Sequence, residues 1–108
     1  MHRAPAIVVL GPGSLATAQL IQQRYPQARI HGLASRVPGA DAYYTAFGDT
    51  LRGLYEDGTP LIALCAAGIV IRSLAGALGD KDDEPPVLAV AEDGSAVVPL
   101  LGGLAGAR

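Results

Sequence analysis

Cysteine, aromatic and charged residues are all scarce in this chain. It contains one cysteine, Cys65, and no tryptophan among its 108 residues. A single cysteine excludes a disulfide framework, so we expect a reducing, cytoplasmic location. Charged residues make up 17% of the chain, whereas soluble domains carry roughly 25%. Because half of the residues are hydrophobic, we expect uncovered apolar surface that a second domain or a dimer partner would meet.

The chain also lacks clustered positive charge and a long apolar run. Its formal net charge is −2, and we expect no nucleic-acid partner, because neutralising phosphates requires grouped Lys and Arg side chains. We expect no membrane span either. The apolar run at residues 61–71 is about half of the roughly 20 residues that a spanning helix needs, and Arg72 closes it.

Residues that could ligate a metal lack the necessary spacing. His2 and His31 stand alone, without the partners of a zinc site. The acidic run from Asp80 to Glu84 does not follow a calcium-loop pattern, and we expect it to be solvated. Cys65 lies between apolar neighbours with no activating histidine motif, so we predict a buried structural thiol. We therefore expect no metal and no cofactor in this domain.

Residues 61–79 organise the predicted fold. The apolar run at residues 61–66 predicts a strand that is buried on both faces. After Gly68 the period changes to that of a helix, with an apolar stripe formed by Ile71, Leu74, Ala75 and Leu78. Arg72 would lie in the first turns of this helix, and Gly79 would end it.

The other segments alternate between strand and helix patterns. We predict strands at residues 5–10, 28–33, 87–91 and 96–100, a turn at residues 92–95, and helices at residues 14–25 and 50–56. Ser14 and Asp49 are the expected helix caps. Residues 34–48 lack a clear period and predict either a functional loop or disorder, with a short element around residues 43–47. Within that loop, Tyr43 and Tyr44 could line a pocket or pack inward.

This order predicts an α/β fold, a three-layer sandwich with a mainly parallel sheet and an antiparallel hairpin near the C-terminus. In such sheets, ligands bind beyond the carboxyl ends of the strands, where the first N–H groups of a helix favour an anion. We therefore predict ligand contacts at Gly13 and Ser14 and at Gly68, Ile69 and Arg72. The guanidinium of Arg72 could bind a carboxylate; the alternative is a solvent-facing helix position.

Residues 11–16 match the letters G-x-G-x-x-A between a predicted strand and helix, which is the setting of a dinucleotide fingerprint. The fingerprint also requires an acidic residue at the end of the second strand, for the ribose. The first acidic residue after that strand is Asp41, which lies too far beyond the end of the strand to complete the fingerprint. A tight turn that allows close packing is the simpler interpretation, and a generic anion site at the helix start is a third.

The second half of the chain resembles one known family. The matching residues are Gly68-Ile69-Val70-Ile71-Arg72-Ser73-Leu74-Ala75, Asp80-Lys81, Pro86-Val87-Leu88-Ala89-Val90, Asp93-Gly94 and Val97-Val98-Pro99-Leu100-Leu101-Gly102-Gly103. They resemble the N-terminal domain of the CbiG-type cobalamin-biosynthesis family, the cobalt-precorrin-5A hydrolases. The resemblance implies opening of the δ-lactone of a cobalt-precorrin with release of acetaldehyde, and it adds Gly102 and Gly103 to the ligand contacts.

The chain departs from the family in two places. It has Leu104 where the family usually has histidine, and it stops at Arg108 where the family continues into a helix and a second domain. The resemblance therefore implies that residues 1–108 are a single domain of a longer protein and inactive alone. Similar domains are also fused ahead of the precorrin-3B methyltransferase, and S-adenosylmethionine would then belong to the fused domain.

Three functional hypotheses follow. The preferred one is a cytoplasmic domain that binds or helps process a precorrin or cobalt-precorrin intermediate, as part of a cobalt-precorrin-5A hydrolase or of a methyltransferase fusion. The second is a non-catalytic domain that docks a downstream domain of the same chain, or a second copy, through apolar surface. The third is a nucleotide-binding module that uses Gly11 and Gly13.

Overall fold

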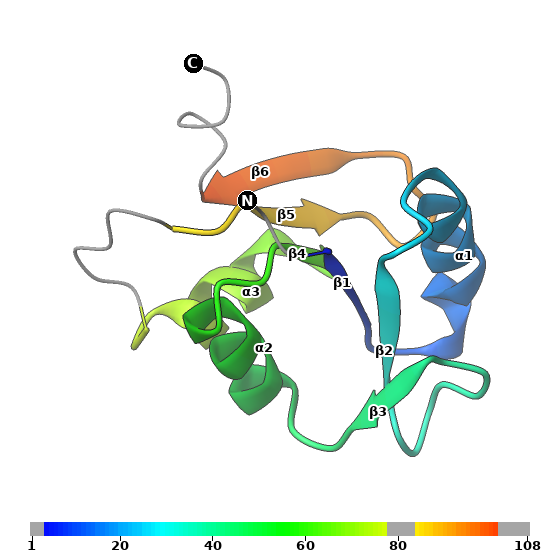
Figure 1. Ribbon diagram of the computed structural model, residues 1–108, viewed down its shortest axis with the longest axis horizontal. Helices are drawn as coiled ribbons and strands as arrows, with labels where there is room; N and C mark the ends of the chain where they lie inside the picture. The colour runs from blue at the N-terminus through cyan, green and yellow to red at the C-terminus, as the bar shows by residue number, and fades with distance from the viewer. Residues whose placement is uncertain (1–3, 78–83, 102–108) are drawn as a thin grey trace.

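The computed structural model describes residues 4–77 and 84–101, which form one sheet flanked by helices (Figure 1). The strands are β1 (Ala6–Val9), β2 (Arg29–Leu33), β3 (Ala42–Tyr44), β4 (Leu61–Leu64), β5 (Val87–Val90) and β6 (Val97–Leu101). The helices are α1 (Leu15–Arg24), which the 3-10 turn η1 (Pro12–Ser14) precedes, α2 (Phe47–Glu56) and α3 (Ala67–Leu74). The predicted strands and helices are present, with bounds that differ by a few residues.

The strands form a six-stranded sheet in the order β3-β2-β1-β4-β5-β6. Strands β1 to β5 are parallel, and β6 runs antiparallel to β5. The hairpin turn between them closes with a hydrogen bond from the Gly94 N–H to the Ala91 carbonyl at 2.8 Å. Gly94 has a φ of +80°, a conformation that glycine adopts at low cost. The predicted α/β fold with a mainly parallel sheet and a C-terminal hairpin is confirmed.

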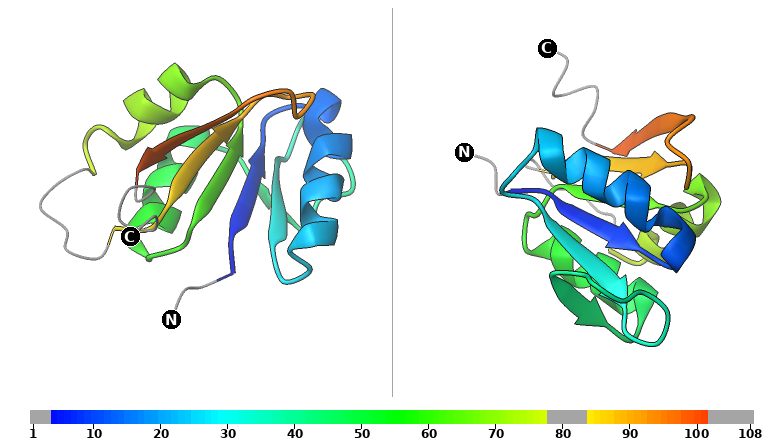
Figure 2. Two further views of the ribbon diagram at one scale, coloured as in Figure 1. Left: turned by 90° about the horizontal axis from the view of Figure 1, so that it is seen from above. Right: turned by 90° about the vertical axis from the view of Figure 1, so that its right-hand side faces the viewer.

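Helices cover both faces of the sheet, α1 on one face and α2 with α3 on the other (Figure 2). Alternate residues of β1 serve the two cores, because successive side chains of a strand point to opposite faces. Ile7 and Val9 pack on the α1 side, whereas Ala6 and Val8 pack on the α2–α3 side. All four are buried, which agrees with the continuous apolar run of this segment.

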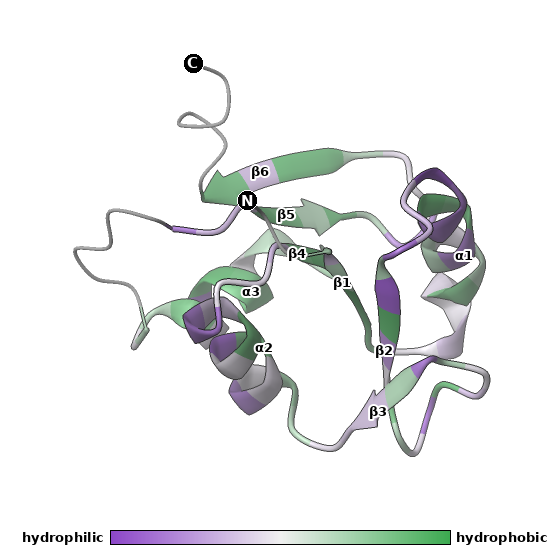
Figure 3. Ribbon diagram, in the orientation of Figure 1, coloured by the Kyte–Doolittle hydropathy of each residue, from purple (hydrophilic) through white to green (hydrophobic). Residues whose placement is uncertain are grey.

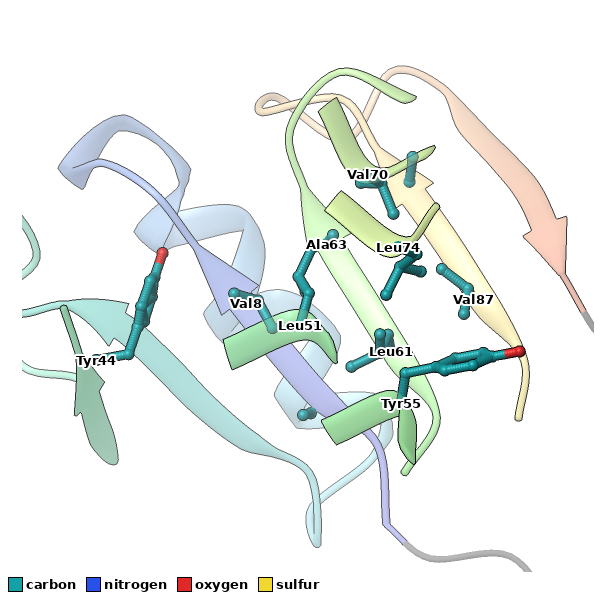
Figure 4. Packing of buried hydrophobic residues seen from close by; sticks show 11 residues of the cluster. Val8, Tyr44, Leu51, Tyr55, Leu61, Ala63, Val70, Leu74 and Val87 are labelled. Carbon is teal, nitrogen blue, oxygen red and sulfur yellow. The ribbon is translucent and has the colours of Figure 1, made fainter. Parts of the chain in front are cut away.

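The core beneath α2 and α3 contains the larger side chains (Figure 4). Leu51 and Tyr55 of α2 and Leu74 of α3 are buried there. A polar contact joins the two helices as well, since the Arg52 guanidinium donates to the Ser73 carbonyl at 3.0 Å. That carbonyl lies in the last turn of α3, where a cation is favourable to the helix dipole.

The structure corrects the predicted pattern of α3. Val70 and Leu74 are its buried side chains, whereas Ile71 and Ala75 are exposed. Val70 takes the buried position that was predicted for Ile71, because the helix begins at Ala67 and its buried face is set by the packing against α2. The helix also ends at Leu74, so Arg72 is in its last turn rather than its first. Leu78 and Gly79 lie outside the described residues.

Ser14 is at the predicted N-cap position of α1 but does not cap through its side chain, and the prediction of Asp49 as a cap was wrong. Helix α2 begins at Phe47, so Asp49 lies within its first turn, where it forms an ion pair with Arg52. A carboxylate in the first turn is favourable to the helix dipole even without capping. The Ser14 side chain makes no capping hydrogen bond, because η1 already continues into α1 and the hydroxyl binds elsewhere.

Contacts at three points hold the loop between β2 and β3 in place, so the loop is ordered rather than disordered. Val37 is buried and packs over Gly32. The hydroxyl of Tyr43 accepts hydrogen bonds from the N–H groups of Gly39 and Ala40, at 3.0 and 3.2 Å. A carboxylate oxygen of Asp41 accepts the Ile30 N–H at 2.9 Å. The loop is therefore a built element and not a passive connection.

We predict that Gly32→Ala destabilises the protein by about 1–3 kcal/mol, the usual cost of overpacking a core. A Cβ at this position would lie 2.8 Å from Cγ1 of Val37. Gly53→Ala is the matched control, because its Cβ would meet no atom within 4 Å, and alanine stabilises a helix interior by about 0.5–1 kcal/mol relative to glycine. Urea unfolding of both variants measures the difference, and effects of the same sign would contradict the packing described for Val37.

The Asp41 carboxylate makes stability depend on pH. Hydrogen bonds from the Ile30 N–H and the Gln22 amide lower the pKa of Asp41 below its usual 3.8. A lowered folded-state pKa contributes stability above pH 3.8, and that contribution is lost as the pH falls through the folded value. We expect Asp41→Asn to flatten the decline of unfolding free energy between about pH 5 and pH 2, measured by urea unfolding. An unchanged decline would contradict this role.

Candidate functional site

The site begins where the chain leaves β1 and β4, two adjacent parallel strands in the middle of the sheet. After β1 the chain passes to α1 on one face, and after β4 it passes to α3 on the other (Figure 2). This divergence is a topological switch point, the position where open α/β sheets bind ligands. The turn at residues 11–14 and the turn at residues 65–68 form its two sides.

The Ser14 hydroxyl is fully buried and donates to a carboxylate oxygen of Glu92 at 3.0 Å. Thr17 donates to the main-chain carbonyl of Glu92 at 2.6 Å. A Cβ on Gly13 would lie 3.6 Å from the same Glu92 oxygen. An internal carboxylate therefore lies beside the start of α1, where the helix dipole favours negative charge. An external anion at Gly13 and Ser14 would have to displace it.

Cys65 and Tyr44 lie close to one another beside the switch point. The Tyr44 hydroxyl donates to the Val9 carbonyl at 2.7 Å, and its ring is buried against Phe47. Burial, and then the negative charge that Cys65 would carry, raise the pKa of Tyr44 to about 12. Burial, and then the Glu92 carboxylate, raise the pKa of the Cys65 thiol to about 11. The thiol is therefore protonated at neutral pH and a poor nucleophile.

The residues predicted on α3 share one exposed surface. Gly68 and Arg72 are four positions apart, so they lie one above the other on the helix. Both are exposed, and Ile69 beside them is 36% exposed. Arg72 forms no ion pair with any carboxylate in the described ranges. This surface begins at the carboxyl end of β4 and lies across the switch point from Gly13, whereas Gly102 and Gly103 lie outside the described residues.

Sequence reasoning missed Arg36, an exposed residue in the turn after β2. The N–H groups of Arg36 and Val37 both donate to the Leu33 carbonyl, at 3.0 and 2.9 Å, and so bend the chain at the sheet edge. This bend brings Nη2 of Arg36 within 3.9 Å of the point that a Cβ on Gly11 would occupy. No local pattern predicts that approach, because it depends on the pairing of β1 with β2.

Asp41 is not in a position to serve as the ribose-binding acidic residue of a dinucleotide site. Asp41 lies at the amino-terminal end of β3, beside Ile30, and not at the carboxyl edge of the sheet. Its carboxylate accepts hydrogen bonds from Ile30 and Gln22.

In the part of the chain that the structure describes, no group of three metal-ligating side chains forms a cluster, and no helix is long and apolar enough to cross a membrane.

The fold and its topological switch point define the class of protein, a doubly wound α/β domain with its candidate site at the carboxyl ends of the strands. Residues 49–108, more than half of the chain, match the family model described as cobalamin synthesis G N-terminal. The chain belongs to that family. It is a cobalamin-biosynthesis domain, as the resemblance in its second half predicted.

Two relatives agree with this assignment. A cobalt-precorrin-5A hydrolase from Salmonella typhimurium is 33% identical over 101 residues, covering 94% of this chain and 29% of that protein. The crystal structure of a cobalamin biosynthesis protein G homolog from Sulfolobus solfataricus has a TM-score of 0.64 at 13% identity, over 93% of this chain and 29% of that chain. That second likeness shows the fold alone. The chain spans less than a third of the length of both relatives.

The Ser14–Glu92 hydrogen bond predicts an asymmetry between two variants. Glu92→Leu leaves a fully buried hydroxyl without its acceptor, which costs about 1–3 kcal/mol. Ser14→Ala leaves an exposed carboxylate that water can solvate, and we expect a loss of about 0.5–1.5 kcal/mol. Glu92→Gln keeps an acceptor and is the matched control. Urea unfolding measures all three, and a larger loss for Ser14→Ala than for Glu92→Leu would contradict the arrangement.

Proposed function

We propose that this domain binds a precorrin or cobalt-precorrin intermediate at the switch-point crevice, through carboxylates on the edge of the ring. The observation that carries the proposal is the meeting of two turns at the carboxyl edge of β1 and β4, one of which leads to the exposed surface of Gly68, Ile69 and Arg72. The 33% identity to a cobalt-precorrin-5A hydrolase supports the choice of ligand.

Each wall of the crevice has a proposed role. The first N–H groups of α3 and the Arg72 guanidinium bind a carboxylate or, in a hydrolase, the oxygen of a lactone carbonyl as negative charge develops on it. Ile69 offers apolar contact to the ring between its carboxylates. Glu92 is the carboxylate beside the other wall, and it orders the turn at Gly13 and Ser14 rather than binding the anionic ligand.

The parent protein is proposed to be either a cobalt-precorrin-5A hydrolase or a fusion with a precorrin-3B methyltransferase. The domain itself holds no cofactor in this account, and S-adenosylmethionine belongs to the fused domain. Its proposed location is the cytoplasm. Catalysis requires the rest of the parent protein.

A docking domain is the second candidate function, and the outer strand of the sheet favours it. Strand β6 is apolar along most of its length (Figure 3), and Val97 and Val98 are 56% and 44% exposed. The contact would bury side chains of β6 against a downstream domain of the same chain. It would not extend the sheet freely, because Pro99 lies in the middle of the strand and lacks an N–H group.

The test of binding is a thermal-shift and absorbance titration of the 108-residue chain with a soluble corrinoid that carries free side-chain carboxylates. A ligand that binds only the folded state stabilises it by about 2.7 kcal/mol at a hundredfold excess over Kd. We expect Arg72→Ala to reduce this stabilisation, with NADH as the ligand control.

Three other outcomes would count against parts of the proposal. Unchanged binding by Arg72→Ala would remove Arg72 from the site. Stabilisation by NADH would favour the nucleotide module. No response to either ligand, together with concentration-dependent self-association, would favour the docking domain.

A further inference from the structure

We propose that the loop after β2, together with Tyr43, forms a subsite for a conjugated ring bearing carboxylates, in which Arg36 binds a carboxylate. The proposal rests on the proposed function and extends the crevice toward β2. A broad, open surface pocket of about 500 Å³, hereafter called the cavity, lies at this position. It is lined by Ala34, Ser35, Arg36, Val37, Pro38 and Tyr43. Its place at the carboxyl edge of β2 puts it beside the turn that follows β1.

The walls of this cavity are ordered before any ligand arrives. Burial of Val37 over Gly32 fixes the middle of the loop. The two N–H groups that donate to the Tyr43 hydroxyl fix the Tyr43 ring to the end of the same loop. Binding to such a site requires little ordering, and a smaller entropy loss on binding favours affinity.

The exposed groups of the cavity match one kind of ligand. Tyr43 is 53% exposed; its hydroxyl oxygen already accepts two N–H groups, so it offers its ring and, at the tip, only an O–H donor. The Arg36 guanidinium is planar and can hold a carboxylate through two parallel hydrogen bonds. No carboxylate among the described residues forms an ion pair with it. An aromatic ring and a cation that line the same pocket suit a flat, conjugated ring with acidic substituents.

The arrangement of charge around the crevice supports the same assignment. Glu92 already lies at the start of α1, where an external carboxylate would meet it as a like charge. Arg36 reaches the other end of the same turn, beside Gly11. A carboxylate of the ligand is therefore attracted to the Arg36 side of the turn and repelled from the Glu92 side.

A second cavity provides a matched control, because it also contains an arginine and an exposed tyrosine. It measures about 310 Å³ and is lined by Ala4, Pro5, Arg24, Tyr25, Pro26, Gln27 and Ala28. It lies at the amino-terminal ends of β1 and β2, on the opposite edge of the sheet from the crevice. Arg24 and Tyr25 therefore match Arg36 and Tyr43 in residue type and differ in place.

The experiment compares Arg36→Gln and Tyr43→Leu with Arg24→Gln and Tyr25→Leu in the 108-residue chain. Two probes are titrated, the carboxylate-bearing corrinoid and a planar carboxylate-bearing porphyrin, with Kd measured by absorbance and folding checked by circular dichroism. We expect Arg36→Gln to weaken binding of both probes by roughly tenfold or more, the size of a charge-assisted hydrogen bond. Tyr43→Leu should weaken it several-fold, and both control variants should bind as the wild type does.

Salt adds an independent readout, because screening weakens exposed ion pairs. Rising salt should weaken wild-type binding more than binding by Arg36→Gln. Full affinity in Arg36→Gln and Tyr43→Leu, or an equal loss in the Arg24 and Tyr25 controls, would overturn the subsite and leave the proposed function standing. Porphyrin binding that depends on Arg36, without any corrinoid binding, would support the subsite and overturn the proposed function. No binding of either probe would overturn both.

Discussion

Strand β1 is paired on both edges and buried on both faces, and the rest of the structure depends on this constraint. Its partners β2 and β4 are parallel to it, and its side chains contribute to both cores. The chain connects β1 to β2 on one side and β4 to β5 on the other, so right-handed crossovers take it over opposite faces of the sheet. The switch point is therefore a consequence of the topology, and it lies where the chain leaves β1 and β4 over opposite faces.

The polar groups around the switch point fall into two sets: one is held by hydrogen bonds within the protein, and the other is exposed and could bind a ligand. Glu92 is held by Ser14 and Thr17 and links the hairpin of β5 and β6 to α1. Arg36 and Arg72, by contrast, have no ion-pair partner among the described residues. Arg36 reaches the turn after β1, and Arg72 lies on α3, the helix that follows β4. A ligand with several carboxylates could meet both arginines, whereas a ligand with one carboxylate would meet only one of them.

The fold could be predicted from the sequence because its signals are local. The apolar run of β4, the glycine turns and the hairpin at residues 92–95 each specify their own segment. The face of α3 was predicted wrongly because Val70 and Ile71 are equally apolar, and only packing against α2 decides which one is buried. The role of Ser14 was missed for a similar reason, since its partner Glu92 is 78 residues away in the chain.

Sequence reasoning reached the glycine turns and Arg72 of the candidate site but missed Arg36. Arg36 belongs to a segment without a clear period, and its approach to Gly11 follows from strand pairing that no short motif encodes. Tyr43 and Tyr44 left two interpretations open, and both hold: Tyr44 packs inward and Tyr43 lines a cavity. Neighbouring residues of a strand point to opposite faces, so adjacent tyrosines of β3 separate into these two roles.

The most direct test of the account is amide chemical-shift mapping of the isotope-labelled chain during titration with the carboxylate-bearing corrinoid. The account predicts perturbed amides along the carboxyl edge of the sheet, at residues 11–14, 34–38 and 65–69. Perturbation confined to the opposite edge, at residues 24–28, or to β6 would contradict it.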